Sequence, residues 1–178
     1  MRTALRDFRH VASLFPSSRY TIRSVLAHVR PQAEAVVEYG PGTGNVTRAI
    51  LRHLGESGRV FCVELNAEFV PNLRRIADPR LQIVEGSVLA VLPSIRASLP
   101  QGADAVISGI PFSLIPEDER EKIVRETRNA LKPGGCFIAY QNSRLLVPLF
   151  ERYFDTVSTQ FEPRNVFPYF IMVGRVAR

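Results

Sequence analysis

The chain has 178 residues, of which 46% are hydrophobic, and this suits one globular domain with its own core. No stretch approaches the roughly 18 consecutive apolar residues of a membrane-spanning helix, and the N-terminus lacks the apolar core of a signal peptide, so we expect a cytoplasmic protein. The formal net charge is +6, and two lysines among 23 basic residues leave 21 arginines. The two cysteines fall in expected buried strands and the three histidines lack metal-ligand spacing, so we expect neither a disulfide nor a metal site.

Residues 1–30 form the first unit of the chain and carry most of its excess positive charge. Residues 3–15 have helical periodicity, with an apolar face opposite a basic face. Such a basic amphipathic helix suits the interface of an anionic membrane, although the same pattern also fits a helix packed against its own domain. The basic and aromatic residues of this segment that we expect at a membrane are Arg2, Arg6, Phe8, Arg9 and Phe15.

Residues 31–178 alternate strands with helices, which predicts a doubly wound α/β domain around a mostly parallel sheet. Strands are expected near 35–39, 59–64, 81–85, 104–108, 135–141, 155–162 and 168–177. Helices are expected near 44–54, 67–77, 88–98, 117–131 and 143–152.

Three glycines at alternate positions join the first of these strands to the helix that follows. Gly40, Gly42 and Gly44 can adopt positive φ, and they let the backbone approach a ligand with no Cβ in the way. A dinucleotide site needs Gly-x-Gly-x-x-Gly, but Asn45 stands where its third glycine would be, so a pyrophosphate ligand is disfavoured. The alternative interpretations of these glycines are the cofactor site of a dehydrogenase and a tight turn that binds no ligand.

Glu38 precedes this turn, and the pattern acid, any residue, Gly-x-Gly-x-Gly resembles that of class I S-adenosylmethionine-dependent methyltransferases. The resemblance implies a seven-stranded Rossmann-like sheet that ends in an antiparallel hairpin, with S-adenosylmethionine as cofactor and S-adenosylhomocysteine as product. It also implies that Glu38 helps to bind the methionine end, largely through water, while the glycines and the intervening Pro41 and Thr43 pass beneath the sulfonium.

The ends of the next two strands extend this resemblance. Glu64 ends its strand 20 residues after Gly44, where a carboxylate can accept hydrogen bonds from both ribose hydroxyls. After the third strand this chain has Gly86, Ser87 and Val88, where many relatives have Gly-Asp-Ala. Ser87 would therefore accept the adenine amino group more weakly than an aspartate, or packing of Leu65 and Val88 would hold the adenine instead.

The turn after the fourth strand faces the methyl group in that family. Its residues Ser108, Gly109, Ile110 and Pro111 resemble the Ser-Gly-Leu-Pro turn of bacterial phospholipid N-methyltransferases, which convert phosphatidylethanolamine to phosphatidylcholine. The resemblance to rRNA adenine dimethylases is more distant, because Ser108 replaces their Asn. The expected catalytic residues are Tyr20, Ser108, Gly109, Pro111 and Phe112, and Ser108 is also expected to adjoin the cofactor.

These features predict methylation of a lipid amine at a membrane of anionic and zwitterionic phospholipids, with the protein attached peripherally to the inner membrane face. Arg19 is expected to hold the lipid phosphate, and Tyr20 to receive the amine proton. The aromatic side chains of Tyr20, Phe112, Tyr140 and Tyr169 would surround a quaternary ammonium. No protein partner is implied. RNA adenine N6-methylation and a cofactor-binding module without turnover are the alternatives.

Overall fold

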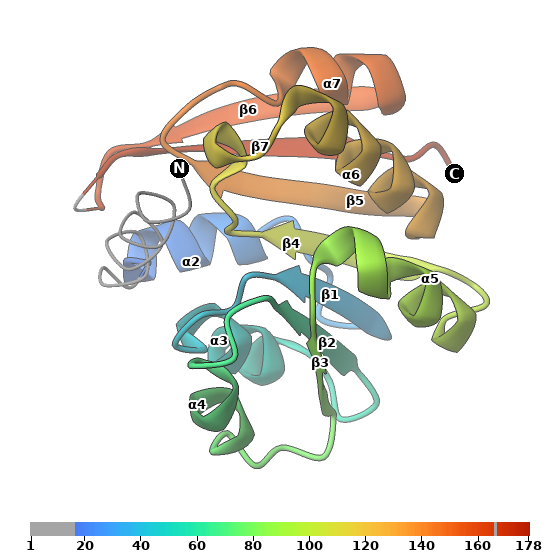
Figure 1. The fold of residues 1–178 in the computed structure, drawn as a ribbon. Coiled ribbons are helices and arrows are strands. Elements are labelled where there is room, and N and C mark those ends of the chain that lie inside the picture. Colours follow the sequence, from blue (N-terminus) through green and yellow to red (C-terminus); the bar gives the residue numbers. More distant parts are fainter. Residues whose placement is uncertain (1–16, 166) are drawn as a thin grey trace.

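The computed structural model describes residues 17–165 and 167–178, which are organised around one seven-stranded sheet (Figure 1). The strand order is β3-β2-β1-β4-β5-β7-β6; neighbours among the first five are parallel, and β7 is antiparallel to both β5 and β6. The predicted doubly wound sheet with a C-terminal hairpin is therefore confirmed. The strands are β1 (Ala35–Tyr39), β2 (Arg59–Glu64), β3 (Leu81–Glu85), β4 (Ala103–Ser108), β5 (Leu131–Gln141), β6 (Thr156–Glu162) and β7 (Tyr169–Arg175).

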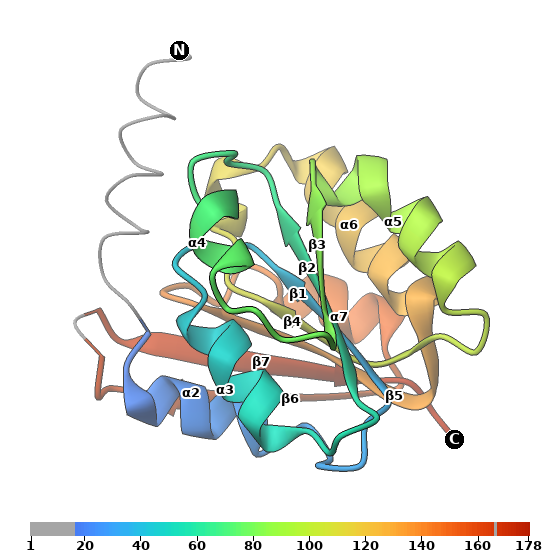
Figure 2. The same ribbon diagram turned by 90° about the horizontal axis from the view of Figure 1, so that it is seen from below.

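Helices cover both faces of the sheet (Figure 2). The α5, α6 and α7 helices share one apolar core with the sheet, while α2 and α3 share another on the opposite face. The helices are α2 (Arg19–Leu26), α3 (Asn45–His53), α4 (Val70–Arg74), α5 (Val88–Ser98), α6 (Glu117–Ala130) and α7 (Val147–Tyr153), with a short 3-10 helix η1 (Phe112–Leu114). None of these helices is long and apolar enough to cross a membrane.

Three predicted elements differ clearly from those in the structure. The helix expected over 143–152 begins only at Val147, just before a proline in its first turn. The expected helix near 67–77 is shortened to α4, which begins just before Pro71, and Ala77 beyond its end has a φ of 51°. The strand expected from 135 begins at Leu131, because Leu131 pairs with Ala103 before a register shift in the ladder. The expected helix over 3–15 lies outside the described residues, as do Arg2, Arg6, Phe8, Arg9 and Phe15.

A buried carboxylate joins the starts of three central strands. Asp104 accepts the backbone N–H of Glu34 at 2.9 Å and that of Ala35 at 3.1 Å, so it holds the beginning of β1 against β4. Its carboxylate also forms ion pairs with Lys132 Nζ at 2.6 Å and Arg30 at 3.3 Å. Although burial opposes ionisation, these bonds lower the pKa of Asp104 below its ordinary value.

The direction of the crossovers changes between β1 and β4. From β1 the chain winds outward to β2 and β3, and after β3 it returns to β4 on the other side of β1. In an open α/β sheet the carboxyl ends of the strands at such a reversal form a ligand-binding crevice. The glycine turn, the end of β2 and the turn after β4 all lie at this edge.

Candidate functional site

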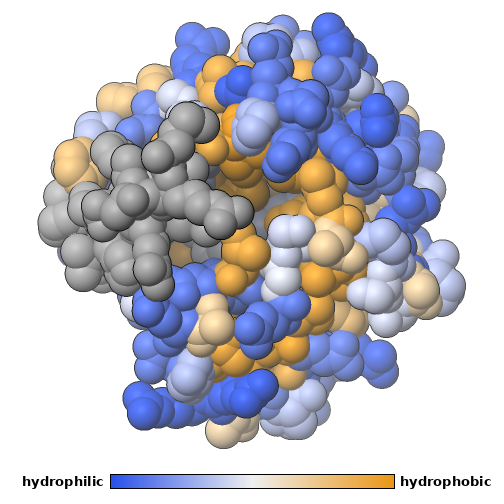
Figure 3. Space-filling model, viewed as in Figure 1, coloured by the Kyte–Doolittle hydropathy of each residue, from blue (hydrophilic) through white to orange (hydrophobic). Residues whose placement is uncertain are grey.

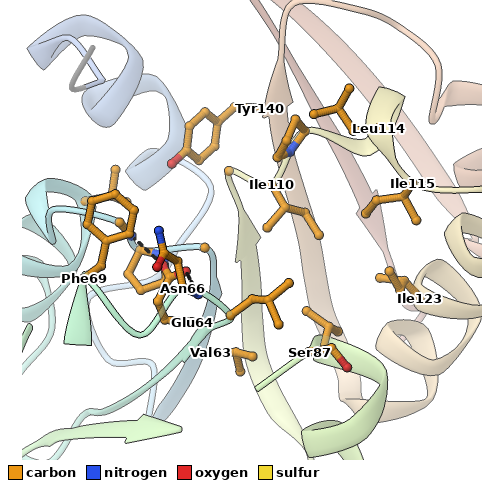
Figure 4. Close-up of a pocket in the computed structure, with 18 of the residues that line it drawn as sticks. Val63, Glu64, Asn66, Phe69, Ser87, Ile110, Leu114, Ile115, Ile123 and Tyr140 are labelled. Carbon is orange, nitrogen blue, oxygen red and sulfur yellow. Dashed lines mark hydrogen bonds between the residues drawn. The ribbon is translucent and has the colours of Figure 1, made fainter. Parts of the chain in front are cut away.

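A cavity of about 300 Å³ opens at the carboxyl ends of the parallel strands. This volume is at the lower end of the range for small-molecule sites. Figure 3 shows a hollow near the centre of this face, bordered by hydrophobic side chains. In Figure 4 Glu64 and Asn66 lie on one wall, Ile115 and Ile123 lie on the opposite wall, and Tyr140 lies above Glu64 and Asn66 in this view. We refer to this cavity as the pocket.

The glycine turn forms one border of the pocket. Its lining includes Gly40, Pro41, Gly42 and Thr43. Gly44 does not line it and is the N-cap residue of α3. Gly40 has a φ of 68°, and a Cβ on it would lie 2.7 Å from Ile110 Cγ2. A glycine is therefore needed at position 40 for two reasons: the backbone has a positive φ, and Ile110 in the turn after β4 approaches closely.

Glu64 is joined to the glycine turn by a hydrogen bond. Its Oε2 accepts the backbone N–H of Gly42 at 3.0 Å, and its Oε1 accepts that of Asn66 at 2.8 Å. The side chain lines the pocket beside Leu65, which is 49% exposed. Each carboxylate oxygen has a second lone pair, so Glu64 can still accept a hydroxyl of a bound sugar.

Glu38 is buried beside the glycine turn and does not itself line the pocket. Its Oε2 accepts the Thr47 hydroxyl at 2.6 Å and the Cys62 thiol at 3.2 Å. Its Oε1 is also buried and has no hydrogen-bond partner among the described residues. Burial raises the pKa of Glu38 to about 7, against the opposing effect of the two hydrogen bonds.

The end of β3 contributes backbone and apolar surface. Gly86, Ser87 and Val88 all line the pocket, as predicted. The Ser87 hydroxyl accepts the Ala90 N–H at 3.3 Å, so it caps the start of α5. Packing by Leu65 and Val88, the second of the two predicted ways to hold an adenine, therefore agrees better with this geometry.

The turn after β4 brings Gly109, Ile110 and Pro111 to the pocket. Gly109 lies directly against the Tyr140 hydroxyl, and a Cβ at position 109 would overlap it. No larger residue fits there unless Tyr140 moves. The backbone of this turn and the Tyr140 ring therefore form one continuous wall.

Two residues predicted at this turn are placed elsewhere. Ser108 is 1% exposed, does not line the pocket, and its Oγ has no hydrogen-bond partner among the described residues. Phe112 is fully buried, because η1 turns its ring into the core at 6.5 Å from that of Phe137. Neither side chain therefore reaches the pocket lining, where both were expected to act.

The predicted aromatic residues divide into two groups. Tyr140 and Tyr169 line the pocket with ring centroids 5.8 Å apart, and burial raises the pKa of both. Tyr20 does not line it: its hydroxyl accepts a hydrogen bond from Arg19 at 2.8 Å, and the guanidinium carbons of Arg19 and Arg164 lie 4.8 and 4.5 Å from its ring centroid. The structure therefore places Tyr20 outside the pocket lining, whereas its roles as proton acceptor and in the ammonium site stay predictions.

Sequence reasoning missed several residues of the pocket. Asn66 and Phe69 follow Glu64 closely, and this proximity to a recognised motif could have identified them. Others are apolar residues without any motif, such as Leu114, Ile115 and Ile123. Glu119, in the first turn of α6, also lines the pocket and carries no motif.

The sequence is similar to several methyltransferases. Residues 36–135, which are 100 of the 178, match the family model of a methyltransferase domain. An ornithine lipid N-methyltransferase from Singulisphaera acidiphila is 32% identical over 168 residues, which span 90% of this chain and 88% of that protein. A ubiquinone/menaquinone biosynthesis C-methyltransferase from Hydrogenovibrio crunogenus is 27% identical, over 78% of this chain and 54% of that protein. A ribosomal RNA small subunit methyltransferase A from Rhizobium etli is 39% identical, over 44% of this chain and 28% of that protein.

Solved structures with the same fold include the O-methyltransferase TomG from Streptomyces achromogenes, in complex with S-adenosylmethionine. The TM-score is 0.71 and the sequence identity 15%, and the alignment covers 92% of this chain and 82% of that one. At this identity the likeness concerns the fold alone.

The pocket fits S-adenosylmethionine as the cofactor. Gly40 leaves no room for a side chain at the turn, Glu64 offers both oxygens, and Leu65 and Val88 offer apolar surface for a base. The buried Oε1 of Glu38 has no partner in the described protein, and a carboxylate close to the site favours a cationic ligand such as a sulfonium. The matched domain, the fold and this pocket agree: the chain belongs to the class I S-adenosylmethionine-dependent methyltransferases.

Proposed function

We propose that this enzyme methylates the amine headgroup of a membrane lipid, namely phosphatidylethanolamine and its methylated derivatives on the route to phosphatidylcholine. The main support is the charge of the pocket. Its charged lining residues are Glu64 and Glu119, and no lysine or arginine of the described residues lines it, although the chain has 21 arginines. A pocket whose described charged side chains are all acidic favours cationic groups, namely a sulfonium and a protonated amine.

The relatives support a lipid more than an RNA. The ornithine lipid enzyme, whose name specifies N-methylation of a lipid, aligns along nearly its whole length. The rRNA enzyme aligns along 28% of its length.

The chemistry requires alignment and the removal of one proton. The bound cofactor supplies an electrophilic methyl group: the N–C bond forms as the S–C bond breaks, and S-adenosylhomocysteine leaves. The glycine turn and Glu64 hold the cofactor, and the wall of Gly109 and Tyr140 limits where the amine can lie. A protonated headgroup amine must first lose a proton to a base or to water.

Glu119 is our candidate for holding this ammonium and accepting its proton. It lies in the first turn of α6 and lines the pocket, and its carboxylate forms no hydrogen bond or ion pair with any other described residue. Glu64 is already engaged by two backbone N–H groups. Glu119 is thus the pocket carboxylate that remains available to a substrate.

We further propose that the enzyme attaches peripherally to the inner face of the membrane through residues 3–15, which belong to the N-terminal amphipathic and lid-type helices over 1–30 that precede the methyltransferase domain of residues 31–178. The basic amphipathic pattern of residues 3–15 supports this assignment, because such a helix binds anionic headgroups through arginine and the acyl boundary through phenylalanine. The lipid surface is the partner that this proposal requires.

The decisive experiment follows the methyl label. Purified protein is incubated with radiolabelled S-adenosylmethionine and vesicles that contain phosphatidylethanolamine, its monomethyl or dimethyl form, or ornithine lipid, with structured rRNA in parallel. Label in the phosphatidylethanolamine series supports the proposal, and label only in ornithine lipid changes the substrate but keeps lipid N-methylation. Label in RNA would replace the proposal with adenine methylation, and cofactor binding without any transfer would favour a module that lacks turnover.

A further inference from the structure

Large exposed apolar side chains gather at one edge of the described protein. They are Leu65, Leu145, Phe161 and Phe167, with exposures of 49%, 40%, 54% and 53%. Leu65 belongs to the pocket. The other three lie outside it and have no role in the site described above.

Strand register brings these three residues to the edge where the pocket opens. Gln141, the last residue of β5, pairs with Phe170 near the start of β7, and Glu162 at the end of β6 pairs with Tyr169. Residues 142–146, 163–165 and 167–168 therefore lie at the same end of the three strands. Tyr169 itself lines the pocket, so these loops adjoin its opening.

The start of α2 lies at the same edge. The backbone N–H of Ser18 donates to Asn165 Oδ1 at 2.8 Å, which ties α2 to the hairpin between β6 and β7. Figure 1 shows the end of this hairpin beside α2. Arg19 follows immediately, and it is exposed.

Two arginines give this edge a free positive charge. Among the described residues, the Arg19 side chain donates only to the neutral Tyr20 hydroxyl, and Arg144 is exposed; neither forms an ion pair with a carboxylate of that part of the chain. Arg164 differs, because Glu162 accepts from it at 2.7 and 2.9 Å and neutralises it. Exposed arginine beside exposed leucine and phenylalanine is typical of surfaces that lie in a membrane interface.

We propose that Arg19, Arg144, Leu145, Phe161 and Phe167 form a second membrane-binding surface, separate from residues 3–15, which we call the rim. The arginines bind phosphates of anionic lipids, and the apolar side chains enter the acyl boundary. Because the rim adjoins the pocket opening, its insertion turns that opening towards the headgroups. The orientation of the pocket rests on the proposed lipid substrate, whereas binding of the rim to a bilayer does not.

A single tryptophan tests where the protein enters the bilayer. The chain has no tryptophan, so Phe161→Trp creates one fluorophore in the rim, and Gln101→Trp places a matched one in the exposed loop before β4, at the opposite edge. Both full-length variants are mixed with vesicles of phosphatidylcholine and phosphatidylglycerol whose acyl chains are brominated. We expect quenching at position 161 and none at position 101. Vesicle binding without quenching at 161 would overturn the proposal.

Charge variants test the arginines. Arg19→Gln combined with Arg144→Gln should lower the vesicle partition coefficient at least about tenfold, because one basic residue near an anionic surface contributes roughly fivefold. The control combines Arg52→Gln with Arg59→Gln, which removes two exposed charges from the opposite edge and should change partition much less. Equal losses in the two variants would show a general charge effect and overturn the proposal.

The rim and the proposed function can fail separately. Phe161→Ser combined with Phe167→Ser should lower methyl transfer to vesicle lipid but leave transfer to detergent-dispersed lipid unchanged. If the wild-type protein methylates lipid neither in vesicles nor in detergent, the proposed function is wrong. The quenching experiment then still tests whether the rim enters the bilayer. If the phenylalanine variant binds vesicles normally but no longer self-associates, the rim is an interface between copies of the chain and the membrane proposal is wrong.

Discussion

Replacement of Glu38 by glutamine should change how the stability of the ligand-free protein depends on pH. Glu38 is fully buried, and its pKa is raised from 4.5 to about 7, chiefly by burial. As pH rises through this range, the unfolded chain loses the Glu38 proton while the folded protein retains it, so the free energy of unfolding falls. At about 1.4 kcal/mol per pH unit, the wild-type protein loses about 3 kcal/mol from this group between 4.5 and 7, and nothing more above 7.

The assay is urea unfolding followed by circular dichroism, because the chain has no tryptophan to report by fluorescence. Glutamine cannot titrate, so the stability of Glu38→Gln relative to wild type should rise by about 3 kcal/mol between about pH 4.5 and 7. The offset caused by the amide itself is constant and cancels from this slope. Glu85→Gln, at an exposed acid, is the control. Parallel curves for wild type and Glu38→Gln would refute the reasoning.

Three further predictions concern the pocket and the fold. Gly40→Ala should weaken S-adenosylmethionine binding at least about tenfold by calorimetry, because its Cβ would meet Ile110 and its φ is positive; Gly55→Ala, where the nearest contact is 3.8 Å, should not. Glu119→Gln should lower kcat for the lipid amine and alter its pH profile without changing cofactor affinity, and an unchanged profile would remove Glu119 from proton transfer. Asp104→Asn should cost about 3 kcal/mol of stability in chemical unfolding, since it weakens a buried pair, while KM for the cofactor stays the same; a loss below about 1 kcal/mol would contradict the role of this carboxylate.

The fold was largely predictable because its strands are apolar runs of the right length between clear turn signals. The predicted ranges 35–39, 59–64 and 81–85 match β1, β2 and β3, and 88–98 matches α5. The start of β5 was missed because it depends on pairing across the sheet, which no local pattern contains.

The site was predictable where backbone conformation restricts the residue type. The glycine turn and Glu64 meet as expected, since each lies at the end of a neighbouring parallel strand. Aromatic roles were not predictable, because aromatic residues fill cores and line pockets equally well. Tyr140 and Phe112 both lie in apolar stretches of the sequence. Tyr140 lines the pocket, whereas Phe112 packs against Phe137 in the core.

The hydrogen bond from the Gly42 N–H to Glu64 fixes the two cofactor motifs, the glycine turn and the end of β2, relative to each other. It forms without the cofactor, so the carboxylate predicted to bind the sugar and the loop predicted to lie beneath the sulfonium are held in mutual position before binding. Little ordering entropy is then lost when the cofactor enters. A substitution in the glycine turn should therefore also displace Glu64, and the reverse. A variant designed to accept an altered cofactor has to redesign the glycine turn and the end of β2 together.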